Sequence, residues 1–137
     1  MRVSRIGAFA VPFFIAGQFH PELTALRRDL HANPELAYEE HRTAGIVAQS
    51  LRVLGLAVEE GIGGTGVVGT LRGGQGKRSV ALRADMDALP MVELGRSEHA
   101  SRMQGKHHGC GHDGHTSMLI GAARQLVRTG VDGTVHF

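Results

Sequence analysis

Cysteine, tryptophan and aromatic residues are scarce in this sequence, and each shortage excludes a class of protein. The single cysteine, Cys110, has no partner for an internal disulfide, and one thiolate is too few for structural zinc sites that need two or four. A lone thiol fits a reducing compartment, so we expect a cytoplasmic protein. Tryptophan is absent and aromatic residues make up 4% of the chain, so recognition of nucleic acid by base stacking is not expected.

The sequence also lacks a large excess of either positive or negative charge. The chain has 15 Lys and Arg residues against 13 Asp and Glu residues, a formal net charge of +2, and the two signs are interleaved. The sequence therefore lacks the basic stripe of a nucleic-acid-binding surface. A hydrophobic content of 42% over 137 residues is enough for one globular domain with a core.

Long hydrophobic runs are missing as well. The longest, residues 6–17, is too short to cross a bilayer and is interrupted by Pro12, so no membrane partner is expected. We expect residues 1–19 to form a peripheral or disordered leader and residues 20–137 to form the domain. A secretory signal is the less favoured reading of residues 1–19, because no small-x-small cleavage site follows the apolar run.

Hydrophobic periodicity predicts three helices and four strands. The helices are expected to start at Pro21 and end before Pro34, to cover about 38–54, and to cover about 114–128. The strands are expected over residues 56–58, 67–71, 79–84 and 131–137, with 72–77 as a hairpin turn and 79–84 in a buried position. This order predicts an α/β sandwich with a mixed sheet, in which the last helix crosses over to a parallel strand.

Residues 105–115 concentrate the groups that bind metals. This stretch holds Cys110, four of the nine histidines and one aspartate, separated by glycines. The thiolate and imidazole of Cys110-Gly-His112 are suitable ligands for Zn²⁺ or a similar divalent ion. The stretch also precedes a helix, where ligands bind in α/β folds. The alternative is an inert cysteine beside solvated histidines, and the density of ligand-type residues favours the metal site.

Asp85 and Asp87 follow the third expected strand. Two acids in this place are suited to hold a cation directly, or to accept hydrogen bonds from ligand histidines. A solvated turn, with Asp87 capping backbone amides, explains them equally well.

Two further motifs carry less information. Gly61-x-Gly63-x-x-Gly66 matches the dinucleotide fingerprint, but a strand is expected after it rather than a helix, so we interpret it as a turn. His31-x-Asn-Pro-Glu35 is compatible with the wall of a site, but a helix end with a proline stop explains it as well.

Four segments together carry a family likeness, and they occur in the family's order. Residues 27–40, 63–66, 82–90 and 110–116 resemble the M20 metallopeptidase family. The likeness is to its amidohydrolase branch, which includes hippurate hydrolases, N-acyl-amino-acid amidohydrolases and auxin-conjugate hydrolases. It covers residues 20–137.

The resemblance implies a catalytic domain of α/β/α type that holds two divalent metals, zinc or manganese, and hydrolyses the amide bond of N-acyl amino acids or related small amides. Cys110 and His112 match two metal ligands of the family, and Asp87 matches the acid that keeps the metal site in order. His115 lies in the same motif without an assigned role.

The sequence also departs from the family. The Gln-Pro-x-Glu-Glu segment that holds the general-base glutamate is expected just after residue 135, and the sequence ends at Phe137. We therefore expect a truncated catalytic domain that is inactive alone. The alternative is a non-catalytic fragment that binds metal weakly or forms a homo-oligomer through an unpaired sheet edge. Locally, His107 and Gly109 stand where the family more often has Met and Ala.

Overall fold

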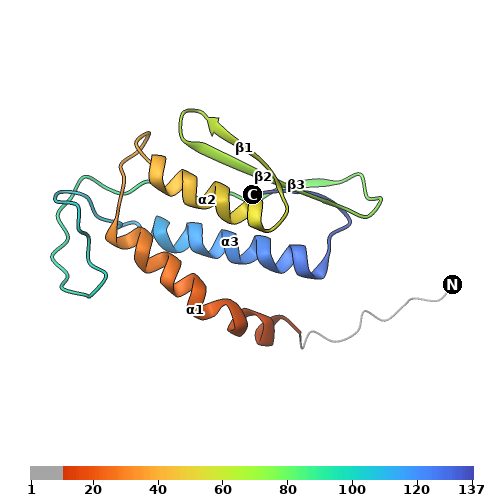
Figure 1. Ribbon diagram of the computed structural model, residues 1–137, viewed down its shortest axis with the longest axis horizontal. Coiled ribbons are helices and arrows are strands. Elements are labelled where there is room, and N and C mark those ends of the chain that lie inside the picture. The colour runs from red at the N-terminus through yellow and green to blue at the C-terminus, as the bar shows by residue number, and fades with distance from the viewer. Residues whose placement is uncertain (1–10) are drawn as a thin grey trace.

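A four-stranded mixed sheet with helices against it forms the fold (Figure 1). The computed structural model describes residues 11–137, with side chains from residue 21 onward. The elements follow the order α1 (Val11–Ala32), α2 (His41–Val53), β1 (Ala57–Ile62), β2 (Gly66–Gly73), β3 (Ser79–Ala81), α3 (His112–Thr129) and β4 (Gly133–His136). The predicted α/β class with a mixed sheet is confirmed.

The strands are arranged in the order β1-β2-β4-β3. β1 and β2 form an antiparallel hairpin, β2 pairs antiparallel with β4, and β4 pairs parallel with β3 through the α3 crossover. The parallel crossover and the turn at Gly61–Gly66 agree with the sequence prediction. The predicted hairpin across residues 72–77 is wrong, because β4 lies between β2 and β3.

Asp132 explains why the glycine-rich segment after β2 does not form a tight hairpin. Its Oδ1 accepts hydrogen bonds from the backbone amides of Gln75, at 2.9 Å, and Gly76, at 2.7 Å. These bonds tie the segment to Asp132, the residue before β4. β3 therefore does not pair with β2, and β4 occupies the position between them.

The predicted burial of the third strand is also wrong. β3 is limited to Ser79–Ala81 at the edge of the sheet, and Val80 is 51% exposed. The apolar sequence of this strand is typical of a buried strand with neighbours on both sides. In the described sheet, β3 has a neighbouring strand on one side only, β4.

α1 begins earlier than predicted. It starts at Val11, and Pro21 lies inside it rather than at its first turn. Residues 11–19 of the expected leader therefore belong to this helix, and residues 1–10 lie outside the described part of the chain. None of the helices that the structure describes is both long and apolar enough to cross a membrane.

The hydrophobic core lies between the sheet and the helices α2 and α3. Its buried residues come from α2, the connection to β1, α3, β4 and the residue after β4: Leu51, Leu56, Ala123, Val135 and Phe137. α1 packs mainly against α3, so it lies outside this central layer. A helical layer on the second face, which the α/β/α resemblance implies, is not among the described elements. α2 ends at Val53, and Gly55, one residue after its C-cap Leu54, has the left-handed φ of 83° that the sequence predicts there.

Gly133 offers a test of the sheet order. Its φ is 127°, and an added Cβ would fall on the backbone carbonyl oxygen of Arg78. We expect Gly133→Ala to lower the free energy of unfolding by about 2 kcal/mol or more, measured by urea denaturation. Gly45→Ala, in α2 with open space around the added Cβ, is the control and should raise stability by up to about 1 kcal/mol. Equal stability of the two variants would contradict the position of β4.

Candidate metal centre

Two hydrogen bonds anchor the chain after β3, one to α3 and one to the connection between α1 and α2. Thr116 Oγ1, in α3, donates to the carbonyl of Asp85 at 3.1 Å, and the Ala88 amide donates to the carbonyl of Glu35, in the connection, at 2.7 Å. These contacts fix Asp87, which lies between the two anchored residues, beside the start of the helix.

Asp87 and His112 form the best-defined pair at this place. His112 Nδ1 lies 2.9 Å from the Asp87 carboxylate Oδ1 and 2.9 Å from the Asp87 carbonyl oxygen. Both partners are acceptors, so Nδ1 carries the proton and Nε2 keeps its lone pair. A histidine fixed in this way by a carboxylate has the tautomer that a metal ligand needs.

Cys110 lies on the turn before α3. It forms no disulfide and is exposed. Gly111 follows it with a φ of 84° and reverses the chain into the helix. Within the described residues, Cys110 and His112 do not belong to a group of three ligand atoms that all lie within 4.8 Å of one another. Their assignment as metal ligands stays a prediction, for which the described residues offer no third ligand.

The other candidate residues of these two motifs, Asp85, His115 and His108, do not join the Asp87–His112 pair through a hydrogen bond. Asp85 forms an ion pair with Arg83 rather than with a histidine. His115 is exposed, one helical turn after His112, and the two ring centroids are 5.7 Å apart. His108 is buried, and neither of its ring nitrogens has a hydrogen-bond partner in the described part of the chain. Burial lowers the pKa of His108, so its imidazole is neutral at pH 7.

A cavity of about 740 Å³ opens beside the Asp87–His112 pair. Both residues line it, together with apolar side chains from α2, α3 and the strands, such as Leu51, Leu119 and Val67. Polar side chains such as Glu40, Thr65 and Arg83 also line it, and its size suits a small molecule.

Sequence reasoning missed the role of Asp113. This residue is 1% exposed, and its Oδ2 lies 3.0 Å from Arg27 Nε and 2.8 Å from His31 Nδ1. Burial alone would raise the pKa of Asp113, but the hydrogen bond from His31 and the charge of Arg27 outweigh it, so this pKa lies below its usual range. The spacing of Arg27 and His31, one helical turn apart, was the available signal that both face one partner.

The fold and these residues define a class of protein. It is a mixed α/β domain whose ligand-type side chains lie between the end of the parallel strand β3 and the start of α3. Comparison with known proteins identifies the family. The profile described as Peptidase family M20/M25/M40 matches residues 81–137. The chain thus matches the M20 peptidase family, which is the family that its four motifs resemble.

Individual relatives extend the match to most of the chain. It is 52% identical to Thermostable carboxypeptidase 2 of Saccharolobus solfataricus over 104 residues, which are 75% of this chain and 26% of the relative. It is 44% identical to Hippurate hydrolase of Campylobacter jejuni over 115 residues, 84% of this chain and 30% of the relative. A crystal structure of a dinuclear metal-binding M20 peptidase from Bacillus subtilis superposes with a TM-score of 0.83 and 36% identity, covering 88% of this chain and 35% of that one. The chain thus spans about a quarter to a third of the length of these relatives.

The buried Asp113 carboxylate is predicted to be a main source of stability. Asp113→Ala removes the partner of the buried His31 ring and the half-exposed Arg27, and we expect it to cost about 3 kcal/mol in urea unfolding followed by circular dichroism. The control is Asp29→Ala, which breaks the exposed pair with Arg42 and should cost no more than about 1 kcal/mol. A loss no larger than that of the control would show that the buried network adds little.

Proposed function

We propose that this chain supplies part of the metal centre of a hydrolase that cleaves the amide bond of N-acyl amino acids or related small amides. Its metal ligands are Cys110 and His112, and Asp87 orients His112. The observation that carries the proposal is the Asp87–His112 hydrogen bond of 2.9 Å, which leaves Nε2 available at the wall of the cavity. The relative named Hippurate hydrolase supports an N-acyl amino acid as substrate, whereas the relative named Thermostable carboxypeptidase 2 keeps a peptide as the second choice.

The residues present fit a divalent metal. A thiolate and a neutral imidazole are ligands that Zn²⁺ takes readily, and the superposed Bacillus subtilis peptidase is described as a dinuclear metal-binding protein. We propose two zinc or manganese ions in the complete site. When bound, they supply an electrophile for the amide carbonyl and lower the pKa of a water molecule. A cytoplasmic location follows from the same proposal, because Cys110 must stay reduced to act as a ligand.

The chain's own residues position this chemistry. Asp87 fixes the tautomer and the plane of the His112 ring, while the apolar wall of the cavity removes water from a small acyl group. Glu40 is the one glutamate of the described residues in that wall, but its buried carboxylate accepts a hydrogen bond from Thr65 at 2.6 Å. Because Glu40 is engaged in this way, we propose that it is not the general base and that the described residues do not supply one.

Metal binding at Cys110 has a selective readout. A Co²⁺–thiolate bond gives a charge-transfer absorption band that oxygen and nitrogen ligands do not give. We expect this band in the parent chain, its loss in Cys110→Ser, and a 10- to 100-fold weaker Co²⁺ affinity, as an order of magnitude, in Asp87→Ala. Asp85→Ala is the matched control, because its carboxylate pairs with Arg83, and it should bind as the parent does. A parent chain without the band would refute Cys110 as a ligand.

Activity is the second test. We expect no hydrolysis of hippurate or N-acetyl amino acids by the 137-residue chain with added Zn²⁺, Mn²⁺ or Co²⁺, because two ligands and no general base cannot complete the reaction. The measurement is release of the free amino acid, with the Campylobacter jejuni hippurate hydrolase as the positive control. Clear metal-dependent release would show that the chain is catalytically complete.

One observation favours a second function, self-association as a homo-oligomer. β3 leaves one side without a neighbouring strand in the described sheet, and Val80 and Leu82 are exposed beside this edge. An open edge with apolar side chains is a template for pairing with another chain. The two functions are separable, because the Co²⁺ band reports Cys110 and not the sheet edge.

A further inference from the structure

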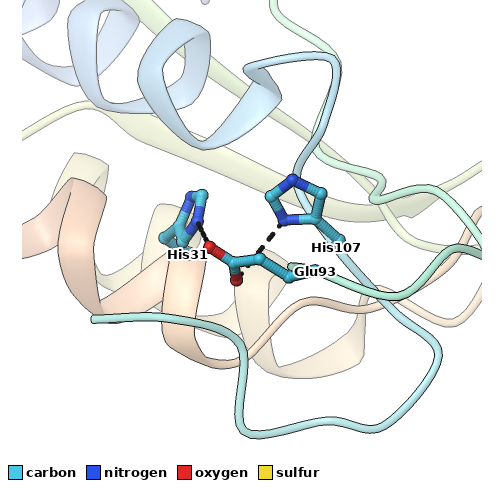
Figure 2. Close-up of side chains that lie close together, drawn as sticks. All are labelled: His31, Glu93 and His107. Atoms are coloured by element: carbon cyan, nitrogen blue, oxygen red, sulfur yellow. Dashed lines mark hydrogen bonds and ion pairs between the residues drawn. The ribbon is translucent and has the colours of Figure 1, made fainter. Parts of the chain in front are cut away.

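Three ligand-type side chains outside the Cys110–His112 pair converge on one point. His31 comes from the end of α1, Glu93 from the long connection after β3, and His107 from the turn before α3 (Figure 2). One ligand atom from each lies within 4.8 Å of the other two, and no other such trio of His, Cys, Asp or Glu exists in the described chain. The side chains are 8%, 11% and 20% exposed, so the cluster is largely shielded from water.

The distances in this cluster suit a shared ion better than hydrogen bonds alone. The Glu93 carboxylate lies between the two rings, with Oε1 3.3 Å from His31 Nε2 and Oε2 3.5 Å from His107 Nδ1. Good N–H···O hydrogen bonds are about 2.7–3.2 Å long. Ligands of a tetrahedral Zn²⁺, at bonds of about 2.0–2.1 Å, lie about 3.4 Å from one another.

The His31 ring is already oriented for coordination. Its Nδ1 lies 2.8 Å from the buried Asp113 carboxylate, so Nδ1 carries a proton and Nε2 faces Glu93. The ring thus lies between two carboxylates, Asp113 at Nδ1 and Glu93 at Nε2, and a cation at Nε2 would be attracted by Glu93. A carboxylate behind a ligand histidine is the arrangement that tunes protein metal sites.

His107 supplies the second ring nitrogen of the cluster. Its Nδ1 is buried without a hydrogen-bond partner among the described residues. A cation between Glu93 and the two rings satisfies both nitrogens at once. Glu93 Oε2 also accepts the Ser101 amide at 2.6 Å, so the carboxylate is held in place by the backbone.

We propose that His31, Glu93 and His107 form a binding site for one divalent transition-metal ion of the zinc type, with ligands distinct from Cys110 and His112. Two imidazoles and one carboxylate favour Zn²⁺ and its neighbours over Mg²⁺ and Ca²⁺, which prefer all-oxygen sites. A bound ion joins α1, the connection after β3 and the turn before α3, so it stabilises the fold as well.

The test removes the thiolate first. In the Cys110→Ser variant we expect calorimetric titration to give one equivalent of bound Zn²⁺, and Zn²⁺ to raise the thermal midpoint, whereas Mg²⁺ does neither. Adding His107→Gln should weaken Zn²⁺ binding at least about 100-fold, because a direct ligand contributes no less than an orienting residue. His99→Gln is the matched control: its ring packs edge-on against His31 at 5.5 Å, outside the trio, and binding should be unchanged.

Two outcomes would overturn this proposal: the absence of Zn²⁺ binding in Cys110→Ser, and equal Zn²⁺ affinity with and without His107. Glu93→Gln keeps the shape and the acceptor for Ser101, so it replaces His107→Gln if circular dichroism shows that variant unfolded. Co²⁺ separates this site from the proposed hydrolase centre, since a His–Glu–His site gives no thiolate charge-transfer band. Either proposal can therefore fail without the other.

Discussion

The contact on which the structure most depends is the buried Asp113 carboxylate between α1 and α3. It holds the Arg27 guanidinium and the His31 ring, one helical turn apart on α1, at 3.0 and 2.8 Å. Asp113 follows His112 directly, so the same contact fixes where the first turn of α3 begins. The Cys110 turn and the Asp87–His112 pair at the cavity wall lie at this helix start, and the cluster around His31 shares the His31–Asp113 contact.

Two carboxylates play the same physical part on two sides of that helix start. Asp87 binds Nδ1 of His112, and Asp113 binds Nδ1 of His31, each at less than 3 Å. Each contact places a proton on Nδ1 and leaves Nε2 to face another partner. Two sets of proposed ligands therefore flank this helix start, and they differ in the group that accompanies histidine: a thiolate, Cys110, in one and a carboxylate, Glu93, in the other.

The local part of this arrangement was predictable from the sequence, and the long-range part was not. Periodicity identified the helices and strands, and motif order identified the family, because both signals lie within short segments. The position of β4 between β2 and β3 depends on Asp132 reaching back to the amides of Gln75 and Gly76, more than 50 positions earlier. The trio of His31, Glu93 and His107 is assembled from three segments, and no spacing rule links residues so far apart. Burial of Asp113 likewise exists only once α1 and α3 pack.

The strand order also bears on how the chain is made. β3 hydrogen-bonds only to β4 in the described sheet, and their register joins Ser79 to Thr134. A chain emerging from the ribosome can close the β1–β2 hairpin early, because those partners are near neighbours in sequence. β3 must wait through the synthesis of the whole of α3 for its neighbour. Its apolar edge is therefore open to the cellular environment during this interval, when a chaperone or a second nascent chain competes with β4 for the same backbone groups.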